Sequence, residues 1–257
     1  MILLTGYRGF VGGEIMRHLS SLGHGFKWLE RMETFYLWHE RVERLFEENR
    51  FDTVIAAGAI SDNQYKNSDI YTWNSFALEI LASHCAQQSA HLIFFSSQIA
   101  RQPTTLYGYS KNLAETMIKV KPALEACILQ PFNIWGAAEA IKPVYTQSLP
   151  FRLAKRNLEK LWRTQRDYVH VSDVVNAVFH ASENRAVGTF EVGTGNVVHS
   201  YDLAGCTEWK GYKKEPTPHY IQKWTCADPK KFLPGWHPTV AVLEEMRGLE
   251  EELQRNT

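Results

Sequence analysis

A glycine-rich loop near the start of the chain reads Thr5-Gly6-Tyr7-Arg8-Gly9-Phe10-Val11-Gly12. It follows a short apolar run at residues 2–5 and opens a segment, 10–22, whose apolar residues recur at helical spacing. Three glycines between a strand and a helix allow a tight turn, a close backbone approach to a pyrophosphate and close helix–strand packing. This context predicts a dinucleotide site at the helix N-terminus. The predicted contacts come from Gly6, Arg8, Gly9, Phe10, Val11 and Gly12.

Beyond this loop, short apolar runs alternate with helical patterns through the first half of the chain. Strands are predicted at 25–29, 53–57, 91–96 and 126–130, and helices at 36–49, 69–88 and 110–119. Such alternation implies crossover connections, so we predict an α/β fold with a doubly wound parallel (Rossmann) sheet. Residues 1–136 would form the dinucleotide-binding domain. Residues 137–257 would form a smaller C-terminal substrate-binding region, with about 168–195 returning to the sheet.

The composition excludes several classes of protein. The 257 residues carry 28 basic and 28 acidic side chains, so we expect no nucleic-acid partner that needs a bulk positive field. No apolar run approaches the roughly 20 residues of a membrane span. Four scattered cysteines and a start without signal-peptide features favour a cytoplasmic protein with reduced thiols. The ten histidines lack metal-ligand spacing, so we expect no catalytic metal.

Three charged residues bear on the choice between NAD and NADP. Glu30 ends the second predicted strand, where an acid usually holds a ribose 2′-hydroxyl and favours NAD. Arg8 lies inside the glycine loop and Arg31 follows Glu30, and a guanidinium binds a 2′-phosphate well. The two arginines favour NADP, with NAD as the alternative.

A tyrosine and a lysine lie four residues apart in Tyr107-Gly108-Tyr109-Ser110-Lys111, at the start of a predicted helix. Residues at this spacing share one helix face, and an ammonium beside a phenol lowers the pKa of the phenol. Ser96 and Ser97 follow strand 91–96 at the sheet edge where ligands of parallel sheets bind. Together these side chains predict proton transfer at a carbonyl or alcohol oxygen.

With these motifs, most of the chain resembles the extended branch of the short-chain dehydrogenase/reductase superfamily, the NAD-dependent epimerase/dehydratase family. Further matching blocks are Val54-Ile55-Ala56-Ala57-Gly58-Ala59-Ile60-Ser61, Asn74, Pro131-Phe132-Asn133-Ile134-Trp135-Gly136, Arg166-Asp167-Tyr168-Val169-His170 and Gly188-Thr189-Phe190-Glu191-Val192-Gly193-Thr194-Gly195. The resemblance implies that Tyr107 is the catalytic acid/base, that Lys111 holds the nicotinamide ribose and tunes Tyr107, and that Ser97 orients the sugar oxygen. It also implies cofactor contacts from Ala57, Gly58, Ala59, Asn74, Ser96, Pro131 and Asn133, besides Glu30, Arg31, Tyr107 and Lys111.

The substrate that the resemblance implies is a nucleotide-linked sugar, contacted by Ser97, Asn133 and Arg166. Arg166 belongs to a run of basic residues, 152–166, that suits a diphosphate. The family also suggests a homodimer through helices 69–88 and 110–119.

Only ten positions separate Ser97 from Tyr107, which resembles compact reductases of 4-keto nucleotide sugars, and Ser97-Gln98-Ile99 lacks the acid of a dehydratase. We therefore expect a reductase in which Tyr107 donates the proton. The alternatives are an epimerase with tightly held NAD and a non-enzymatic dinucleotide sensor. The sequence does not identify the sugar or the nucleotide.

Overall fold

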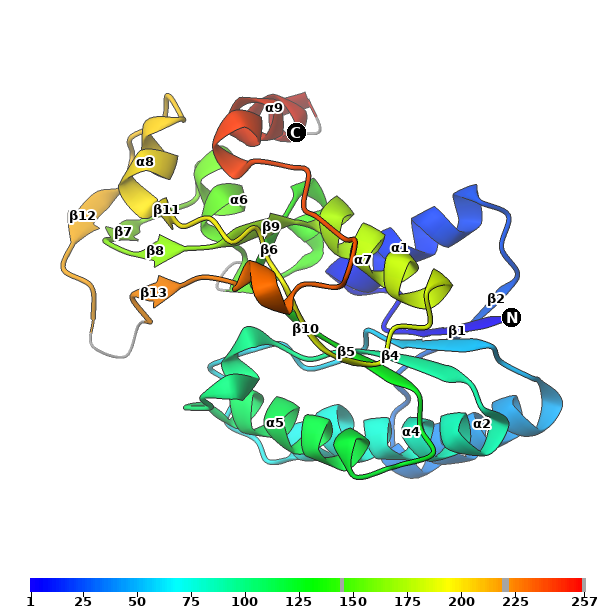
Figure 1. Cartoon of the computed structure of the whole chain (residues 1–257). Helices are drawn as coiled ribbons and strands as arrows, with labels where there is room; N and C mark the ends of the chain where they lie inside the picture. The colour runs from blue at the N-terminus through cyan, green and yellow to red at the C-terminus, as the bar shows by residue number, and fades with distance from the viewer. Residues whose placement is uncertain (144–145, 219–221, 256–257) are drawn as a thin grey trace. The chain divides into compact units, whose positions relative to one another are not determined.

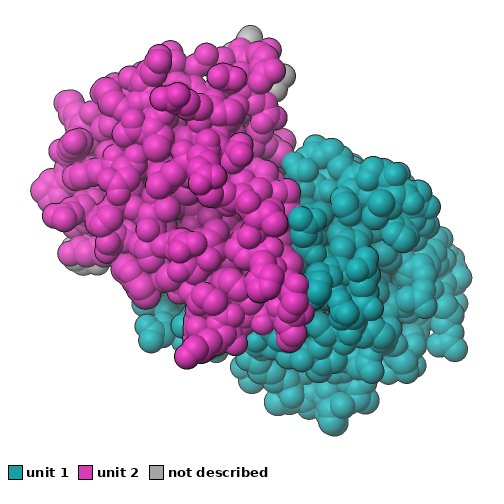
Figure 2. All heavy atoms as spheres, turned by 45° about the horizontal axis from the view of Figure 1, so that its top comes forward, with its two compact units in different colours: residues 1–130, 175–190 teal, residues 131–174, 191–257 magenta. Residues whose placement is uncertain are grey.

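The computed structural model of the protein describes residues 1–143, 146–218 and 222–255 (Figure 1). The chain forms two compact units, coloured separately in Figure 2. The first contains residues 1–130 and 175–190, and the second contains residues 131–174 and 191–257. The domain boundary after residue 136 stays a prediction.

A six-stranded sheet with the strand order β10-β5-β4-β3-β1-β2 forms the centre of the first unit. The strands are β1 (Ile2–Thr5), β2 (Phe26–Leu29), β3 (Thr53–Ala56), β4 (His91–Phe95), β5 (Ala126–Pro131) and β10 (Gly188–Val192). The four pairs from β2 through β1, β3 and β4 to β5 are all parallel. Every residue of β3 and β4 is buried, as expected for central strands covered on both faces.

Helices cover both faces of this sheet. The helical elements of the first half are α1 (Phe10–Ser21), α2 (Phe35–Glu48), α3 (Asp69–Tyr71), the π-helical turn η1 (Thr72–Phe76), α4 (Ala77–Gln88), the 3₁₀ turn η2 (Gln98–Arg101) and α5 (Leu106–Lys119). Figure 1 shows α2, α4 and α5 on one face, with α1 and α7 (Val171–Glu183) on the other. This arrangement confirms the predicted doubly wound parallel fold.

Two helices differ from the prediction in ways that affect the site. Helix α5 begins at Leu106 rather than at 110, because the Thr105 hydroxyl accepts a hydrogen bond from Gly108 N (3.1 Å) and caps an earlier turn. Tyr107 therefore lies in the first turn of α5. The predicted helix 69–88 contains the π-helical turn η1, which carries Asn74. Such turns are rare and frequently occur at functional sites.

The second unit is built from short elements around its own apolar core. They are β6 (Asn133–Trp135), η3 (Ala137–Ile141), α6 (Leu149–Ala154), β7 (Lys160–Trp162), β8 (Gln165–Arg166), β9 (Tyr168–His170), β11 (Val198–His199), α8 (Ser200–Gly205), β12 (Lys213–Glu215), β13 (Trp224–Thr225), η5 (Pro229–Lys231) and α9 (Val242–Arg255). Trp135, Phe151 and Met246 are among the core residues. The buried Asp167 carboxylate accepts hydrogen bonds from the backbone N–H groups of Thr194, Gly195 and Ala227, and so joins three segments.

Within residues 1–143, 146–218 and 222–255, none of the helices is long and apolar enough to cross a membrane. No three histidine, cysteine or acidic side chains of these residues are grouped so that they could hold a metal ion.

Candidate active site

The glycine loop between β1 and α1 has no room for side chains at two of its positions. A Cβ atom on Gly12 would lie 2.1 Å from the carbonyl oxygen of Gly6. Gly6 has a φ of +72°, and a Cβ atom there would lie 2.5 Å from the backbone of Gly58. Gly58, at the end of β3, donates its N–H to the Thr5 hydroxyl (3.1 Å). The ends of β1 and β3 therefore meet with only backbone between them.

Gly9 is the residue that opens helix α1. Its N–H donates to the Gly6 carbonyl (2.9 Å), and no side chain caps the first turn of α1. The free N–H groups of a helix N-terminus attract anions. The close backbone at Gly6 and Gly12 and the uncapped helix together fit a dinucleotide pyrophosphate, so the residues present suit the predicted cofactor.

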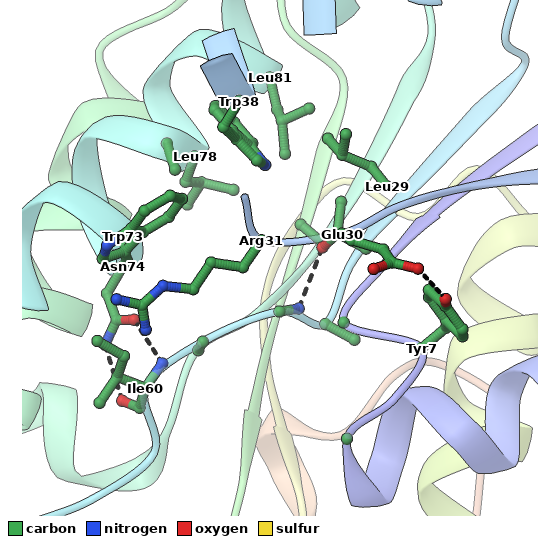
Figure 3. A pocket seen from close by; sticks show the side chains of 18 of the residues that line it. Tyr7, Leu29, Glu30, Arg31, Trp38, Ile60, Trp73, Asn74, Leu78 and Leu81 are labelled. Atoms are coloured by element: carbon green, nitrogen blue, oxygen red, sulfur yellow. Dashed lines mark hydrogen bonds between the residues drawn. The ribbon is translucent and has the colours of Figure 1, made fainter. Parts of the chain in front are cut away.

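A cavity of about 410 Å³ opens beside this loop (Figure 3). It is lined by the loop, the ends of β2 and β3, and the helical segment from η1 to α4. The lining residues are Thr5, Gly6, Tyr7, Arg8, Gly9, Leu29, Glu30, Arg31, Trp38, Ala56, Ala57, Gly58, Ala59, Ile60, Trp73, Asn74, Ala77, Leu78, Leu81 and Phe94. The cavity thus brings together most of the predicted cofactor residues of the first unit. The other predicted cofactor residues of this unit do not line it: Phe10, Val11, Gly12, Ser96, Tyr107 and Lys111.

The three charged residues Arg8, Glu30 and Arg31 all line this cavity. The Glu30 carboxylate accepts a hydrogen bond from the Tyr7 hydroxyl and pairs with Arg8 (3.0 Å). Arg31 lies over the indole ring of Trp73, 4.5 Å from its centroid, and its guanidinium is 3.7 Å from Asp69. Both arginines therefore have an acidic neighbour.

Asn74 lines the cavity, but its amide is engaged with protein groups. Its Oδ1 accepts from Ile60 N (2.8 Å), and its Nδ2 donates to Ile60 O (3.0 Å) and to Ser110 Oγ (3.0 Å). Asn74 therefore joins the loop after β3 to helix α5, one residue before Lys111.

The three predicted catalytic residues meet at the carboxyl end of β4. Ser97 follows this strand and hydrogen-bonds to Tyr107 on α5. Lys111 is 2% exposed, and its Nζ donates to the Phe95 carbonyl (2.6 Å). The same Nζ lies 4.8 Å from the ring centroid of Phe94, which lines the cavity, and 6.0 Å from that of Tyr107. The lysine therefore stands directly behind the cavity wall.

Burial shifts the pKa of both reactive groups toward their neutral forms. Burial raises the pKa of the Tyr107 phenol, and the hydrogen bond from Ser97 opposes this. Burial lowers the pKa of Lys111 to about 7, against the charge of Glu115, which raises it. Burial therefore has the largest effect on the pKa of Tyr107 in the chain by itself, and the tuning of Tyr107 by Lys111 stays a prediction.

Ser96, predicted to contact the cofactor, instead forms part of a buried network behind the catalytic residues. Its hydroxyl donates to Glu115 (2.5 Å), a carboxylate that is only 5% exposed. Glu115 also accepts from Gln130 Nε2 (2.7 Å) and Lys119 Nζ (2.9 Å). This network holds the end of β4, just before Ser97, against helix α5.

The remaining predicted residues belong to the second unit. Pro131 ends β5, and the Asn133 amide donates to Asp167 O (2.7 Å) and Thr225 Oγ1 (3.1 Å). Arg166 lies in β8, where its guanidinium donates to Gln222 O (2.5 Å) and burial lowers its pKa. The basic run 152–166 does not converge on one place, since Arg156 pairs with Glu250 and Lys160 with Glu215.

Several lining residues were not predicted from the sequence. Trp38, Trp73, Leu78 and Leu81 build the apolar end of the cavity, and Glu115 lies behind the lysine. Two features of the sequence point to these residues: the high tryptophan content, and Glu115 as the last residue of the Tyr107–Glu115 motif. In the second unit, a separate hollow is lined by Arg163, Tyr201, Lys214, Glu215, Pro216, Thr217 and Lys223.

The chain is similar to known proteins in sequence and in fold. The chain is 23% identical to an ADP-L-glycero-D-manno-heptose-6-epimerase of Nitratidesulfovibrio vulgaris, over 86% of this chain and 84% of that protein. Its fold is similar to that of the corresponding Helicobacter pylori enzyme (TM-score 0.85, 20% identity, covering 98% and 96% of the two chains). It is also similar to a Thermotoga maritima UDP-glucose 4-epimerase bound to UDP-glucose (TM-score 0.83, 20% identity, 99% and 98%).

Residues 2–193 match the model of one protein family, described as the NAD dependent epimerase/dehydratase family. The match runs from β1 through the glycine loop, the Tyr107–Lys111 pair and Arg166 to β10. It covers well over half of the chain and confirms the resemblance seen in the sequence. The chain therefore belongs to the NAD dependent epimerase/dehydratase family.

Proposed function

We propose that the protein is an NAD-dependent epimerase of a nucleotide-linked sugar. The observation that carries the proposal is the meeting of Ser97, Tyr107 and Lys111 at the carboxyl end of β4, behind a cavity formed at a glycine loop. The names of the similar proteins, which are sugar-nucleotide epimerases, support epimerisation over the net reduction favoured by the sequence alone.

Tyr107, Ser97 and Lys111 have different roles in the proposed reaction. A bound NAD would supply the hydride chemistry, as the acceptor of a hydride from a sugar carbon and its donor to the other face of that carbon. Tyr107 takes the proton from the sugar hydroxyl and gives it back to the same oxygen, while Ser97 hydrogen-bonds to that oxygen. A protonated Lys111 stabilises the phenolate that is present before the first of these proton transfers and again after the second. Arg166 stays a predicted contact of the phosphates of the nucleotide.

We infer that the cofactor is NAD rather than NADP. Glu30 lines the cavity at the end of β2, and it already pairs with Arg8 (3.0 Å). A 2′-phosphate at this place would set two negative charges side by side. The test is a competition between NAD and NADP by calorimetry. We expect NAD to bind more tightly than NADP, and Glu30→Gln to reduce the difference between the two affinities. Tighter binding of NADP by the unaltered protein would contradict the inference.

Replacing Tyr107 by phenylalanine tests its proposed role in proton transfer. We expect Tyr107→Phe to lose at least about 100-fold in turnover and to bind NAD as before, because only the proton-transferring oxygen is removed. Tyr109→Phe is the matched control, since Tyr109 lies on the same helix and is 50% exposed. Equal turnover of the Tyr107→Phe variant and the unaltered protein would refute the role.

A reductase of a 4-keto nucleotide sugar is the second candidate. Burial holds the Tyr107 phenol in its protonated form, which is the form that a reductase needs first. Incubation with a panel of sugar nucleotides separates the two functions. An epimerase converts one sugar nucleotide into its isomer without net change in reduced nicotinamide, and a reductase consumes one NADPH for each product molecule.

Two partly exposed aromatic side chains bear on the oligomeric state of the protein. We propose a homodimer through the outer faces of α4 and α5, because Phe76 and Tyr109, at the starts of these two helical segments, are about half exposed. Light scattering of the Phe76→Asp variant tests this, and a dimer that persists in that variant would contradict it. The cytoplasmic location and the lack of a nucleic-acid partner stay predictions.

A further inference from the structure

The first unit contains two clusters made of the same three kinds of side chain, a serine, a glutamate and a lysine. In one of them, the Glu79 carboxylate on α4 accepts from Ser83 Oγ (3.0 Å) and from Lys121 Nζ (2.7 Å). The side chain of Glu79 is 37% exposed, so water and salt screen its charge. A cluster of this kind has little effect on groups beyond it.

The other cluster lies behind the catalytic residues and is dry. Its carboxylate, Glu115, is 5% exposed and accepts from Ser96 Oγ (2.5 Å), Gln130 Nε2 (2.7 Å) and Lys119 Nζ (2.9 Å). A charge in such a place is costly, and it persists only where hydrogen bonds and an opposite charge compensate it. The charge of Glu115 therefore acts on its neighbours with little screening.

The two oxygens of the Glu115 carboxylate have different partners. Oε1 accepts from Ser96, which follows β4, and from Gln130 in β5. Oε2 accepts from Lys119, whose side chain is 51% exposed. If the two donors to Oε1 were lost, only this half-exposed lysine would hold the carboxylate, and it would draw the charge toward solvent.

Backbone atoms of β4 connect this carboxylate to the catalytic lysine. Glu115 lies one helical turn after Lys111 on α5, and both side chains are buried. Lys111 Nζ donates to the carbonyl of Phe95 (2.6 Å), and the hydroxyl of the next residue, Ser96, donates to Glu115. Two consecutive residues at the end of β4 therefore bind the lysine and the carboxylate.

The titratable neighbours of Lys111 lie on its own helix. Tyr107 is one turn before it, and Glu115 is one turn after it. The adjoining parts of β4 and β5 contribute Phe94 and Gln130, which carry no charge. Burial lowers the pKa of Lys111 to about 7, and the charge of Glu115 raises it. Glu115 is therefore the group that favours the ammonium form.

We propose that Ser96 is a positioning residue, which with Gln130 holds the Glu115 carboxylate in the interior as the counter-ion that keeps Lys111 protonated. The proposal deepens the proposed function and rests on it for its consequence, because a protonated Lys111 stabilises the Tyr107 phenolate only in that reaction. This role is separate from the predicted contact of Ser96 with the cofactor.

The protonation of Lys111 can be measured directly. Lysine labelled with carbon-13 at Cε is titrated by NMR in the full chain before any nucleotide is added, and the Lys111 signal is the one absent from Lys111→Met. We expect Ser96→Ala to lower the midpoint of this signal by about half a pH unit and Glu115→Gln to lower it by about one. Ser83→Ala is the matched control, because it removes the same hydrogen bond from Glu79 and should leave the midpoint unchanged.

The double variant tests whether Ser96 acts through the carboxylate. With Glu115→Gln in place there is no charge for the serine to hold, so adding Ser96→Ala should move the midpoint no further. An equal shift with and without Glu115→Gln would overturn the proposal, because the serine would then act through the backbone of β4.

Lys119→Met should have the opposite effect. This lysine is half exposed, so its replacement leaves the buried network in place. Glu115 then has no other cation on its second oxygen, and its attraction for Lys111 increases. The midpoint of Lys111 should therefore rise, which a general loosening of the structure does not produce. A midpoint that falls or stays constant would overturn the proposal.

Failure of this proposal can be told apart from failure of the proposed function. An unaltered protein that isomerises no sugar nucleotide refutes the proposed function, whatever the titration shows. Isomerisation by the unaltered protein, together with a Lys111 midpoint that is insensitive to Ser96→Ala and Glu115→Gln, refutes only the role of Ser96.

Discussion

The glycine cradle and the catalytic edge of the first unit lie at the ends of neighbouring strands but are made in opposite ways. At the cradle, Gly6, Gly12 and Gly58 bring backbone against backbone and leave space for a ligand. At the edge, the buried side chains of Lys111 and Glu115 bring charge into a dry interior. The cradle therefore depends on having no side chains at these glycines. The edge depends on how the cost of burying Lys111 compares with its attraction to the Glu115 charge. Different substitutions should break each of them.

The largest effect is expected at the cradle. Gly12→Ala would put a methyl group 2.1 Å from the Gly6 carbonyl, so the loop must move. We expect a loss of about 3 kcal/mol in the free energy of unfolding and loss of measurable NAD binding. Gly13→Ala is the matched control, because its methyl group would lie 3.4 Å from the nearest atom outside the helix backbone. Urea denaturation and calorimetry measure both variants, and equal behaviour of the two would show that the cradle tolerates a side chain.

Lys111→Met should separate function from stability at the catalytic edge. We expect it to abolish turnover and yet stabilise the fold by about 1 kcal/mol near neutral pH, because an ammonium is no longer buried. The pKa of Lys111 is lowered to about 7, so the unfolded chain binds more protons than the folded one from there up to the ordinary lysine range. The burial penalty is complete below pH 7 and is lost as the pH rises.

The advantage of Lys111→Met should therefore shrink between about pH 7 and pH 10. Thermal unfolding over this range measures it, with Lys121→Met as the control. Lys121 is a partly exposed lysine paired with Glu79 (2.7 Å), so its loss should not stabilise the fold. A stability difference that stays constant with pH would contradict the assignment of the buried charge to Lys111.

The smallest effect is expected from Glu115→Gln. The amide can still accept from Ser96, but the negative charge that raises the pKa of Lys111 is removed. The pKa of Lys111 then falls further, and the alkaline limb of the pH–turnover profile should move down by about one pH unit. Glu79→Gln is the matched control, because Glu79 also accepts from a serine and a lysine but on α4. A lowered turnover with an unmoved profile would reduce Glu115 to a purely structural role.

The parts of the fold predicted well from the sequence are those specified by neighbouring residues. The glycine spacing between β1 and α1, the apolar run of β4 and the Tyr107–Lys111 pair each lie within one short segment. The start of α5 was predicted four residues late, because Tyr107-Gly108 resembles a loop until the Thr105 cap is recognised. The sequence favours net reduction through the compact Ser97–Tyr107 connection, and NADP through two arginines weighed against Glu30. The choices between reduction and epimerisation and between NADP and NAD both stay proposals.

Residues far apart in the chain decide the features that could not be predicted. Arg8 supports NADP in the sequence, but in the structure its guanidinium pairs with Glu30. The position of Ser96 after β4 predicts a contact with the cofactor, which stays a prediction, and the sequence does not show that its hydroxyl donates to Glu115. Neither contact has a local pattern, because each depends on how a helix packs beside a strand.

The local sequence determined the parallel α/β fold, the dinucleotide loop and the tyrosine–lysine pair, because glycine spacing, apolar periodicity and helical spacing act over a few residues. Tertiary structure alone decided that β2 is an edge strand, that Arg31 covers Trp73, and that Lys111 loses its charge near pH 7. These properties arise from burial and from contacts between distant segments, and both exist only once the chain has folded.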